Sequence, residues 1–172
     1  MNASTPVPVH SGRARADPRC ALCDGDGGEP VWRDARLRVV LADEPEFPGF
    51  TRVVWTEHVP EMTDLALRDR IRLLGVVCMV ESAMRAVLKP HKVNLASLGN
   101  AVPHLHWHVV PRYADDARHP GSPWSAPPVP EAGGADRSAR AAARREAVRA
   151  LLPRYRAALH DALEAVGSHR AR

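Results

Sequence analysis

The strongest constraint on the fold is the stretch 63–90, in which apolar side chains recur at helical spacing. Thr63 is suited to cap the start of a helix, and Pro90 cannot continue one, so a single long helix is expected between them. One side of this helix carries Leu67, Ile71, Leu74, Cys78, Ser82 and Arg85, and its apolar stripe is widened by Leu73, Val76, Val77, Val80, Met84 and Val87. A stripe of this width must pack against another layer, and we expect Cys78 to be buried there as a small apolar side chain.

Short β-rich runs lie on both sides of this helix. The five predicted strands are 30–34, 36–43, 50–58, 92–99 and 104–112. The first two are separated by a tight turn, as are the last two, so each pair is expected to form a hairpin. Short links between successive strands favour an antiparallel sheet with the helix packed on one face. The predicted fold class is therefore α+β, with about five strands, one long helix and a C-terminal helical tail.

The two ends of the chain differ in composition from this central region. Residues 1–17 are polar and show no periodicity, so we expect them to be disordered, with the main domain spanning 18–125. Residues 126–172 are expected to form a Pro/Gly-rich loop and then an Ala/Arg-rich helical tail, broken into two helices at Pro153. The sequence has no signal-like or membrane-spanning apolar run, and its three cysteines make a poor disulfide framework. These features predict a cytoplasmic protein that does not associate with membranes.

The formal net charge of +4 comes mostly from arginines in the tail, between residues 137 and 172. A basic tail of this kind can bind nucleic acid or an acidic partner. Here the arginines lack interleaved aromatic residues, and the sequence contains no known nucleic-acid-binding motif. We therefore interpret the tail as a solvated arginine-rich helix, and nucleic acid is not an expected partner.

Three histidines, His104, His106 and His108, occupy alternate positions of the last predicted strand. Side chains alternate between the faces of a strand, so the three share one face at intervals of ~6.8 Å, and Leu105 and Trp107 face the core. They could form a solvated polar face, a metal site or a catalytic set. The spacing is wide for one zinc shell with Zn–N distances of ~2.1 Å. An imidazole with an ordinary pKa of ~6.5 is a good nucleophile at neutral pH, and its neighbours can assist it.

This segment resembles the signature of the histidine triad (HIT) family, His-φ-His-φ-His-φ-φ, where φ is an apolar residue. Residues 104–110 satisfy every position of the signature and are followed by Pro111 and Arg112. Upstream, residues 43–65 resemble the acidic loop, Pro-Gly turn, strand and histidine that precede the helix in that family. The similarity extends over about 20–112 and leaves both ends of the chain uncovered.

The resemblance implies nucleotide chemistry in a HIT-like fold. His106 would attack the α-phosphorus and form a covalent nucleotidyl-histidine, which water or another acceptor then releases. His108 would contact the phosphate and assist the leaving group, and the backbone around His104 would fix the tautomer of His106. The expected enzyme is a nucleotide hydrolase or nucleotidyl transferase that acts on dinucleoside polyphosphates or nucleoside phosphoramidates. Two alternatives are a catalytically weak nucleotide-binding sensor or partner-binding module, and a nucleic-acid end-processing enzyme that uses the arginine-rich tail.

The resemblance also implies substrate-binding residues outside the triad. Asn94 lies near the position of the family's phosphate-side asparagine, and Gly99 and Asn100 match a Gly-Gln pair with Asn in place of Gln. Asp43 matches an acidic residue that holds ribose hydroxyls. The chain departs from the family at Ala101, where many members carry a Ser or Thr that donates to the phosphate or leaving group. The two asparagines are also compatible with capping roles, and Asp43 with an Asx turn.

Cys20 and Cys23 form a close pair that precedes a turn-rich segment. Such a pair can be redox-active or metal-binding, but its surroundings do not resemble a thioredoxin-like strand-to-helix turn. Several HIT-related branches combine the pair with a histidine at the end of the third strand and with the first histidine of the triad, here His58 and His104. The resemblance thus implies a structural zinc site of two cysteines and two histidines. It further implies a homodimer in which two sheets join edge to edge.

Overall fold

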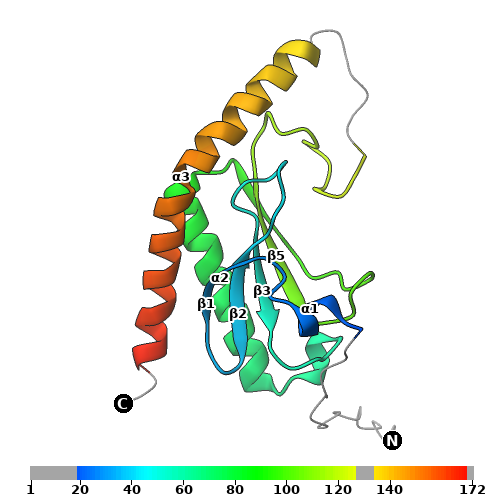
Figure 1. Ribbon diagram of the computed structural model, residues 1–172, viewed down its shortest axis with the longest axis vertical. Coiled ribbons are helices and arrows are strands. Elements are labelled where there is room, and N and C mark those ends of the chain that lie inside the picture. Colours follow the sequence, from blue (N-terminus) through cyan, green and yellow to red (C-terminus); the bar gives the residue numbers. More distant parts are fainter. Residues whose placement is uncertain (1–18, 127–133, 170–172) are drawn as a thin grey trace, which may run out of the picture.

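The computed structural model describes residues 19–126 and 134–169, and the centre of this part is one five-stranded antiparallel sheet (Figure 1). The strands are β1 (Glu29–Arg33), β2 (Leu37–Leu41), β3 (Thr51–Trp55), β4 (Lys92–Ala96) and β5 (His106–Arg112), in the spatial order β1-β2-β3-β5-β4. The α-helices of the described residues are α1 (Ala21–Asp24), α2 (Leu67–Leu88) and α3 (Gly134–His169). The predicted α+β class is confirmed. The predicted disorder of residues 1–17 lies outside the described residues.

Both predicted hairpins form. Asp34 closes the turn between β1 and β2, because its carboxylate accepts two backbone N–H groups of the turn. β5 pairs with β4 on one side and with β3 on the other, which places the last strand inside the sheet. Residues directly opposite each other in an antiparallel pair share a face. Because Val54 lies opposite His106 and Arg52 opposite His108, β3 contributes both of these residues to the histidine face.

The other face of the sheet carries the main core and is covered by α2. Its central residues are Leu37, Val39, Val53, Trp55 and Val109 from the sheet and Leu73, Val76, Val77, Val80 and Met84 from the helix. Leu105 is buried in this core and Trp107 packs against it, as the strand alternation predicts. The sheet therefore separates an apolar, helix-covered side from the side that bears the histidines.

The entry to α2 differs from the prediction. Residues Met62–Asp64 form a separate 3-10 turn, η1, and α2 begins only after Ala66. A capping box between Glu61 and Asp64 satisfies the backbone N–H groups at the start of η1. Thr63 lies inside this turn, so its predicted role as the N-cap of the long helix is wrong.

The side of α2 that meets the sheet also differs from the prediction. The buried residues are Leu73, Val76, Val77, Val80, Met84, Val87 and Leu88. Leu67, Ile71 and Leu74 point outwards, with 68%, 62% and 41% of their surface exposed, and Cys78 is exposed as well. The predicted burial of Cys78 is therefore wrong. Because the run is apolar on two sides, its periodicity identifies a helix without identifying which side faces the sheet.

The C-terminal helix α3 is continuous, so the predicted break at Pro153 is wrong. Pro153 is exposed, whereas Val148, Tyr155, Leu159 and Leu163, which lie on both sides of it, are buried in the main core. Proline removes one helical hydrogen bond, and the packing of α3 against α2 and β1 compensates for it. Figure 1 shows α3 running alongside α2. No helix in the described part of the chain combines the length and apolar character needed to cross a membrane.

Candidate functional site

The three histidines lie on the face of the sheet opposite α2, at the beginning of β5. His104, His106 and His108 are buried, with 0%, 8% and 7% of their surface exposed. The ring centroids of His106 and His108 are 4.6 Å apart. His104 precedes the strand, in a segment held to its neighbours by backbone hydrogen bonds of Leu105. This burial rules out a solvated polar face.

The hydrogen bonding of His106 defines its tautomer. Its Nδ1 lies 2.5 Å from the carbonyl oxygen of His104, and a carbonyl oxygen can only accept. Nδ1 therefore carries the proton, and Nε2 keeps its lone pair. Burial lowers the pKa of His106, as does the nearby charge of Arg52, whereas the bond to His104 acts in the opposite direction. The ring is thus held as a neutral imidazole with an unprotonated Nε2.

His108 has different surroundings. Burial is the main reason that its pKa is lowered to about 4, and the neighbouring His106 and Arg52 make smaller contributions in the same direction. Its Nδ1 has no hydrogen-bond partner among the described residues. Two aromatic rings contact it edge-on, those of Phe50 at 5.3 Å and Trp124 at 5.2 Å between centroids. His108 is therefore a neutral imidazole beside an aromatic wall.

Two arginines on the same face hold the segment that follows α1. Arg38 is 8% exposed and donates to carbonyl oxygens of residues 22–26, and Arg52 donates to the carbonyl oxygen of Gly27 at 2.6 Å. Arg52 lies opposite His108 in the strand register. Each guanidinium also lies near a carboxylate, Asp26 at 4.0 Å from Arg38 and Glu44 at 3.5 Å from Arg52, and Arg52 brings a positive charge close to His106 and His108.

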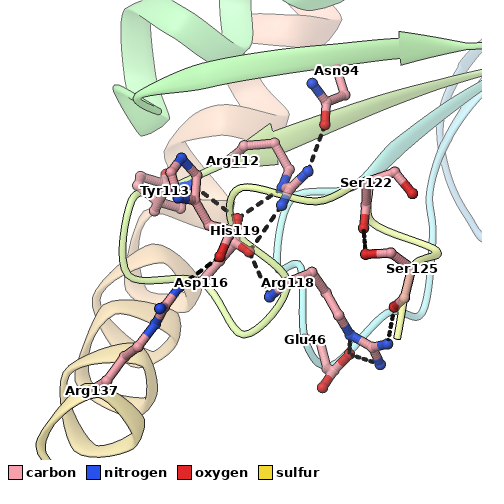
Figure 2. Close-up of polar contacts among 10 residues, drawn as sticks. All are labelled: Glu46, Asn94, Arg112, Tyr113, Asp116, Arg118, His119, Ser122, Ser125 and Arg137. Atoms are coloured by element: carbon pink, nitrogen blue, oxygen red, sulfur yellow. Dashed lines mark hydrogen bonds and ion pairs between the residues drawn. The ribbon is translucent and has the colours of Figure 1, made fainter. Parts of the chain in front are cut away.

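Asn94 comes from β4 and lies on the histidine face, opposite Val110. Its Oδ1 accepts a hydrogen bond of 2.6 Å from Nη1 of Arg112. The same guanidinium donates through Nε and Nη2 to the two carboxylate oxygens of Asp116, at 2.7 and 3.0 Å. Figure 2 shows this chain of contacts from β4 to the loop after β5. Arg112 therefore fixes the orientation of the Asn94 amide.

The other predicted substrate-binding residues lie further from these contacts. Gly99 has a φ of +73°, which favours glycine in the turn between β4 and β5, and Asn100 and Ala101 are exposed in that turn. Asp43 is exposed and borders a hollow of about 340 Å³, together with Arg149 of α3. Within residues 19–126 and 134–169, neither Asp43 nor Asn100 forms a hydrogen bond or ion pair with the triad.

A second cluster lies beside the triad and includes its first histidine. Sγ of Cys20 and Sγ of Cys23 each lie 3.5 Å from Nδ1 of His104, and Sγ of Cys23 lies 3.3 Å from Nδ1 of His58. All four ligand atoms are within 4.8 Å of one another. Tetrahedral zinc with bonds of 2.0–2.3 Å places its ligand atoms about 3.6 Å apart. The four residues therefore have the donor types and spacing to hold such a metal.

The tautomer of His104 also suits a metal ligand. Its Nε2 lies 2.7 Å from the carbonyl oxygen of Trp55 and must carry the proton, which leaves the lone pair of Nδ1 directed at the two sulfur atoms. A hydrogen bond of this kind from the second ring nitrogen orients histidine ligands in metal sites. Around the cluster, Cys20 and Leu22 pack against Val54 in a small core on the histidine face.

A sequence model of the HIT domain matches residues 29–115, just over half of the chain. The chain belongs to the HIT domain family. It is 31% identical over 96 residues to the AP-4-A phosphorylase of Mycobacterium tuberculosis, and the match covers 52% of this chain and 49% of that protein. The chain thus spans about half the length of the curated relative that it matches.

Solved structures of HIT proteins share the fold. A histidine triad protein from Marinobacter aquaeolei VT8 is 26% identical, with a TM-score of 0.57 and with 80% of this chain and 96% of that chain covered. A Zn-bound histidine triad family protein from Mycobacterium smegmatis is also 26% identical, with a TM-score of 0.52 and coverages of 85% and 94%. These similarities confirm the HIT-like fold expected from the triad motif.

Several residues around the triad of this HIT domain were not predicted from the sequence. Arg52 was missed because its place beside His108 depends on the pairing of β3 with β5, which strand alternation does not reveal. Trp124 was missed because it lies in a loop without periodicity, sixteen positions after His108 in the sequence. An aromatic residue in a Pro/Gly-rich loop soon after the motif is the one signal that could have indicated it.

Proposed function

We propose that this HIT protein is a nucleotide hydrolase or nucleotidyl transferase that cleaves its substrate at the α-phosphorus through a covalent intermediate on His106. One observation carries the proposal: the hydrogen bond from Nδ1 of His106 to the carbonyl oxygen of His104. It leaves Nε2 unprotonated and fixed in direction, which a nucleophilic imidazole requires. The positive charge of Arg52 near the ring supports binding of a phosphate next to it.

The proposed reaction has two displacements. Nε2 of His106 forms a bond to phosphorus while the bond to the leaving group breaks. A water molecule or another acceptor then attacks phosphorus, releases the nucleoside monophosphate and restores His106. In the free protein His108 is neutral, but an anionic phosphate beside it favours its charged form. Substrate binding would thus allow His108 to take up a proton and pass it to the leaving group.

The roles of the other residues follow the same proposal. Asn94 would donate its amide N–H groups to a phosphate oxygen, and this is consistent with its Oδ1 being occupied by Arg112. Gly99 and Asn100 would approach the phosphate from the turn between β4 and β5, and Asp43 would hold ribose hydroxyls. Dinucleoside polyphosphates and nucleoside phosphoramidates are the proposed substrates. The similarity to an AP-4-A phosphorylase supports the first of these classes.

The cofactor in this proposal is a structural zinc held by Cys20, Cys23, His58 and His104. Zinc would supply a cross-link between the N-terminal segment and the residue that precedes β5. The ligand spacings support it, as does the likeness to a Zn-bound relative.

The partner in this proposal is a second copy of the chain. Leu67, Ile71 and Leu74 form an exposed apolar stripe on α2, and Leu95 of β4 is 40% exposed. β4 is at the end of the sheet order and, in the described part of the chain, pairs only with β5. An edge strand and an apolar stripe that nothing in residues 19–126 and 134–169 covers support a homodimer formed through them.

Release of mononucleotide tests the enzymatic proposal. Wild-type protein is expected to release AMP from an adenosine phosphoramidate or a dinucleoside polyphosphate, and His106→Ala is expected to lower the rate by at least about 10³-fold. His91→Ala, which changes an exposed histidine outside the site, serves as the matched control and should keep the wild-type rate. An acid-labile nucleotidyl adduct should be detected by mass on the wild type. The same adduct should be absent from His106→Ala.

A nucleotide-binding sensor is the second candidate, and Ala101 favours it because this position has no hydroxyl group to offer a phosphate or leaving group. The same assay separates the two. If wild type and His106→Ala both bind nucleotide and are equally inert, the sensor is the correct function.

A further inference from the structure

The edge strand β4 extends the histidine face beyond His108. In the register of β4 and β5, Ala96 lies opposite His108, and Lys92 lies opposite Arg112 at the other end of the pair. Asn94 lies between them. Directly opposite residues share a face, so all three β4 residues lie on the face that bears the triad. At about 3.4 Å per residue, Lys92 is roughly 14 Å from Ala96 along the strand.

The proposed reaction has a direction along this face. His106 attacks phosphorus and His108 serves the leaving group, so the leaving group lies on the side of His106 towards which β5 continues to Arg112. A leaving group that carries further phosphates would therefore extend along β4, past Asn94 and towards Lys92.

Asn94 offers hydrogen-bond donors on this path. Its Oδ1 accepts from Nη1 of Arg112 at 2.6 Å, and Figure 2 shows its amide nitrogen directed away from Arg112. Arg112 is 4% exposed and forms two hydrogen bonds with the carboxylate of Asp116. The charge of Arg112 is therefore compensated within the protein, and its contribution here is to orient the Asn94 amide.

Lys92 provides the uncompensated charge on this path. Its side chain is exposed, and its ammonium group forms no ion pair or hydrogen bond with residues 19–126 or 134–169. A lysine carries three donors on a flexible four-carbon stem, which allows it to follow a mobile phosphate. Edge-to-edge pairing of β4 with a second copy would engage backbone groups, so this side chain would stay on the histidine face.

We propose that Lys92 is a specificity-determining residue that binds the terminal phosphates of a polyphosphate leaving group. The inference rests on the proposed function, in which His106 and His108 act on the α-phosphorus. It separates the two proposed substrate classes. Dinucleoside polyphosphates place negative charge at Lys92, whereas the amine of a simple phosphoramidate carries no phosphate to bind there.

The chemical step is the same with or without this contact. The bond from Nε2 of His106 to the α-phosphorus forms as the bond from that phosphorus to the bridging oxygen breaks. The electron pair stays on the bridging oxygen, which takes the proton that His108 acquired on substrate binding. The polyphosphate then leaves, and water releases the nucleotidyl group from His106. Lys92 exchanges no proton and acts only by binding the leaving group.

Diadenosine tetraphosphate and unsubstituted adenosine phosphoramidate test the proposal. Lys92→Met is expected to lower the ratio of kcat/KM for the tetraphosphate over the phosphoramidate by about 10- to 100-fold, the range of one charged hydrogen bond. Lys92→Arg, which keeps the charge, should restore most of the ratio.

Lys89→Met is the matched control, because Lys89 is the other lysine of the chain and is exposed at the end of α2. It removes the same charge and should keep the wild-type ratio. An unchanged ratio in Lys92→Met, or an equal fall in Lys89→Met, would overturn the proposal.

Equilibrium binding separates this inference from the proposed function. By titration calorimetry, the double variant His106→Ala/Lys92→Met should bind diadenosine tetraphosphate at least about 10-fold more weakly than His106→Ala does, with a much smaller change for AMP. If the wild type cleaves neither substrate, the proposed function fails, while this affinity difference still decides the role of Lys92. Equal tetraphosphate affinities in the two variants would refute that role.

Discussion

His106 and His108 are neighbours on one strand, yet their ring nitrogens have different partners. Nδ1 of His106 is bonded to a backbone carbonyl oxygen, and Nδ1 of His108 has no partner in the described part of the chain. A carbonyl partner fixes both the ring and its proton, which suits a nucleophile. A ring without such a partner can change its protonation state when a charged ligand arrives, which suits a proton carrier.

The titration of His108 should reflect this difference. Its pKa of about 4 lies below the ordinary value of ~6.5, so the ring stays neutral as the pH falls to about 5. The folded state then binds fewer protons than the unfolded state, and stability is lost as the pH falls from about 6.5 through about 4. NMR of the imidazole C–H signals should show a midpoint near 4 in the free protein. Adding AMP should raise it, because the phosphate favours the imidazolium.

A midpoint near 6.5 in the free protein would contradict this environment for His108. A midpoint that stays near 4 with bound AMP would show that the phosphate does not bind next to His108.

The triad itself could be predicted from the sequence because its information is local. Alternation along one strand places His104, His106 and His108 on one face without knowledge of any other strand. Arg52 and Trp124 could not be predicted, because their places depend on strand order and on a loop held by ion pairs. The histidines of the triad could therefore be identified from the sequence, whereas the groups around them could not.

The loop after β5 is held by one buried ion pair, and its energetics can be measured. Burial alone would raise the pKa of Asp116, but hydrogen bonds from Arg112 and from backbone N–H groups lower it. Asp116→Ala would leave the Arg112 guanidinium buried without its partner, and we expect unfolding in urea to show a loss of about 3–5 kcal/mol.

Asp115→Ala is the matched control for this loop. Asp115 pairs with Arg144, whose side chain is half exposed, so its removal should cost less than about 1 kcal/mol. Equal losses for Asp115→Ala and Asp116→Ala would show that the buried pair does not hold the loop.

The segment around α1 should depend on metal. Wild-type protein is expected to contain one zinc per chain by elemental analysis, and Cys20→Ala should lose it and unfold at a lower temperature. Cys78→Ala removes an exposed thiol from α2 and serves as the control, with zinc content unchanged. Full zinc occupancy in Cys20→Ala would show that Cys20 is not a zinc ligand.

Hydrophobic periodicity correctly predicted which segments form strands and helices. It did not predict the features that depend on packing between elements. All five strands and the long helix follow from their patterns. The exposed side of α2 and the continuity of α3 through Pro153 depend on which neighbours cover each helix, and the sequence around them does not contain that information. The capping box of Glu61 and Asp64 could not be expected from the sequence, because glutamate is not a favoured N-cap residue and the usual pattern places it at N3.

At the scale of the whole molecule, α2 exposes Leu67, Ile71 and Leu74 in the described part of the chain, and the proposed homodimer would cover them. Ile71→Glu/Leu74→Glu places two charges in that interface, where their desolvation is not compensated. We expect the dimer dissociation constant to rise at least about 100-fold in sedimentation experiments. Ala147→Glu, which adds a charge to the exposed side of α3, should leave it unchanged. A wild-type monomer at high concentration would contradict the homodimer.

His104 contacts both the cysteine pair and the ring of His106. Its Nδ1 faces the cysteines, its Nε2 is bonded to Trp55, and its carbonyl oxygen holds the ring of His106. If His106 is the nucleophile, as proposed, a shift of the His104 backbone would turn its Nε2 away from the phosphorus. Chelation of the proposed zinc is therefore expected to reduce turnover through misalignment of His106, so trace-metal supply during expression would set the active fraction of a preparation.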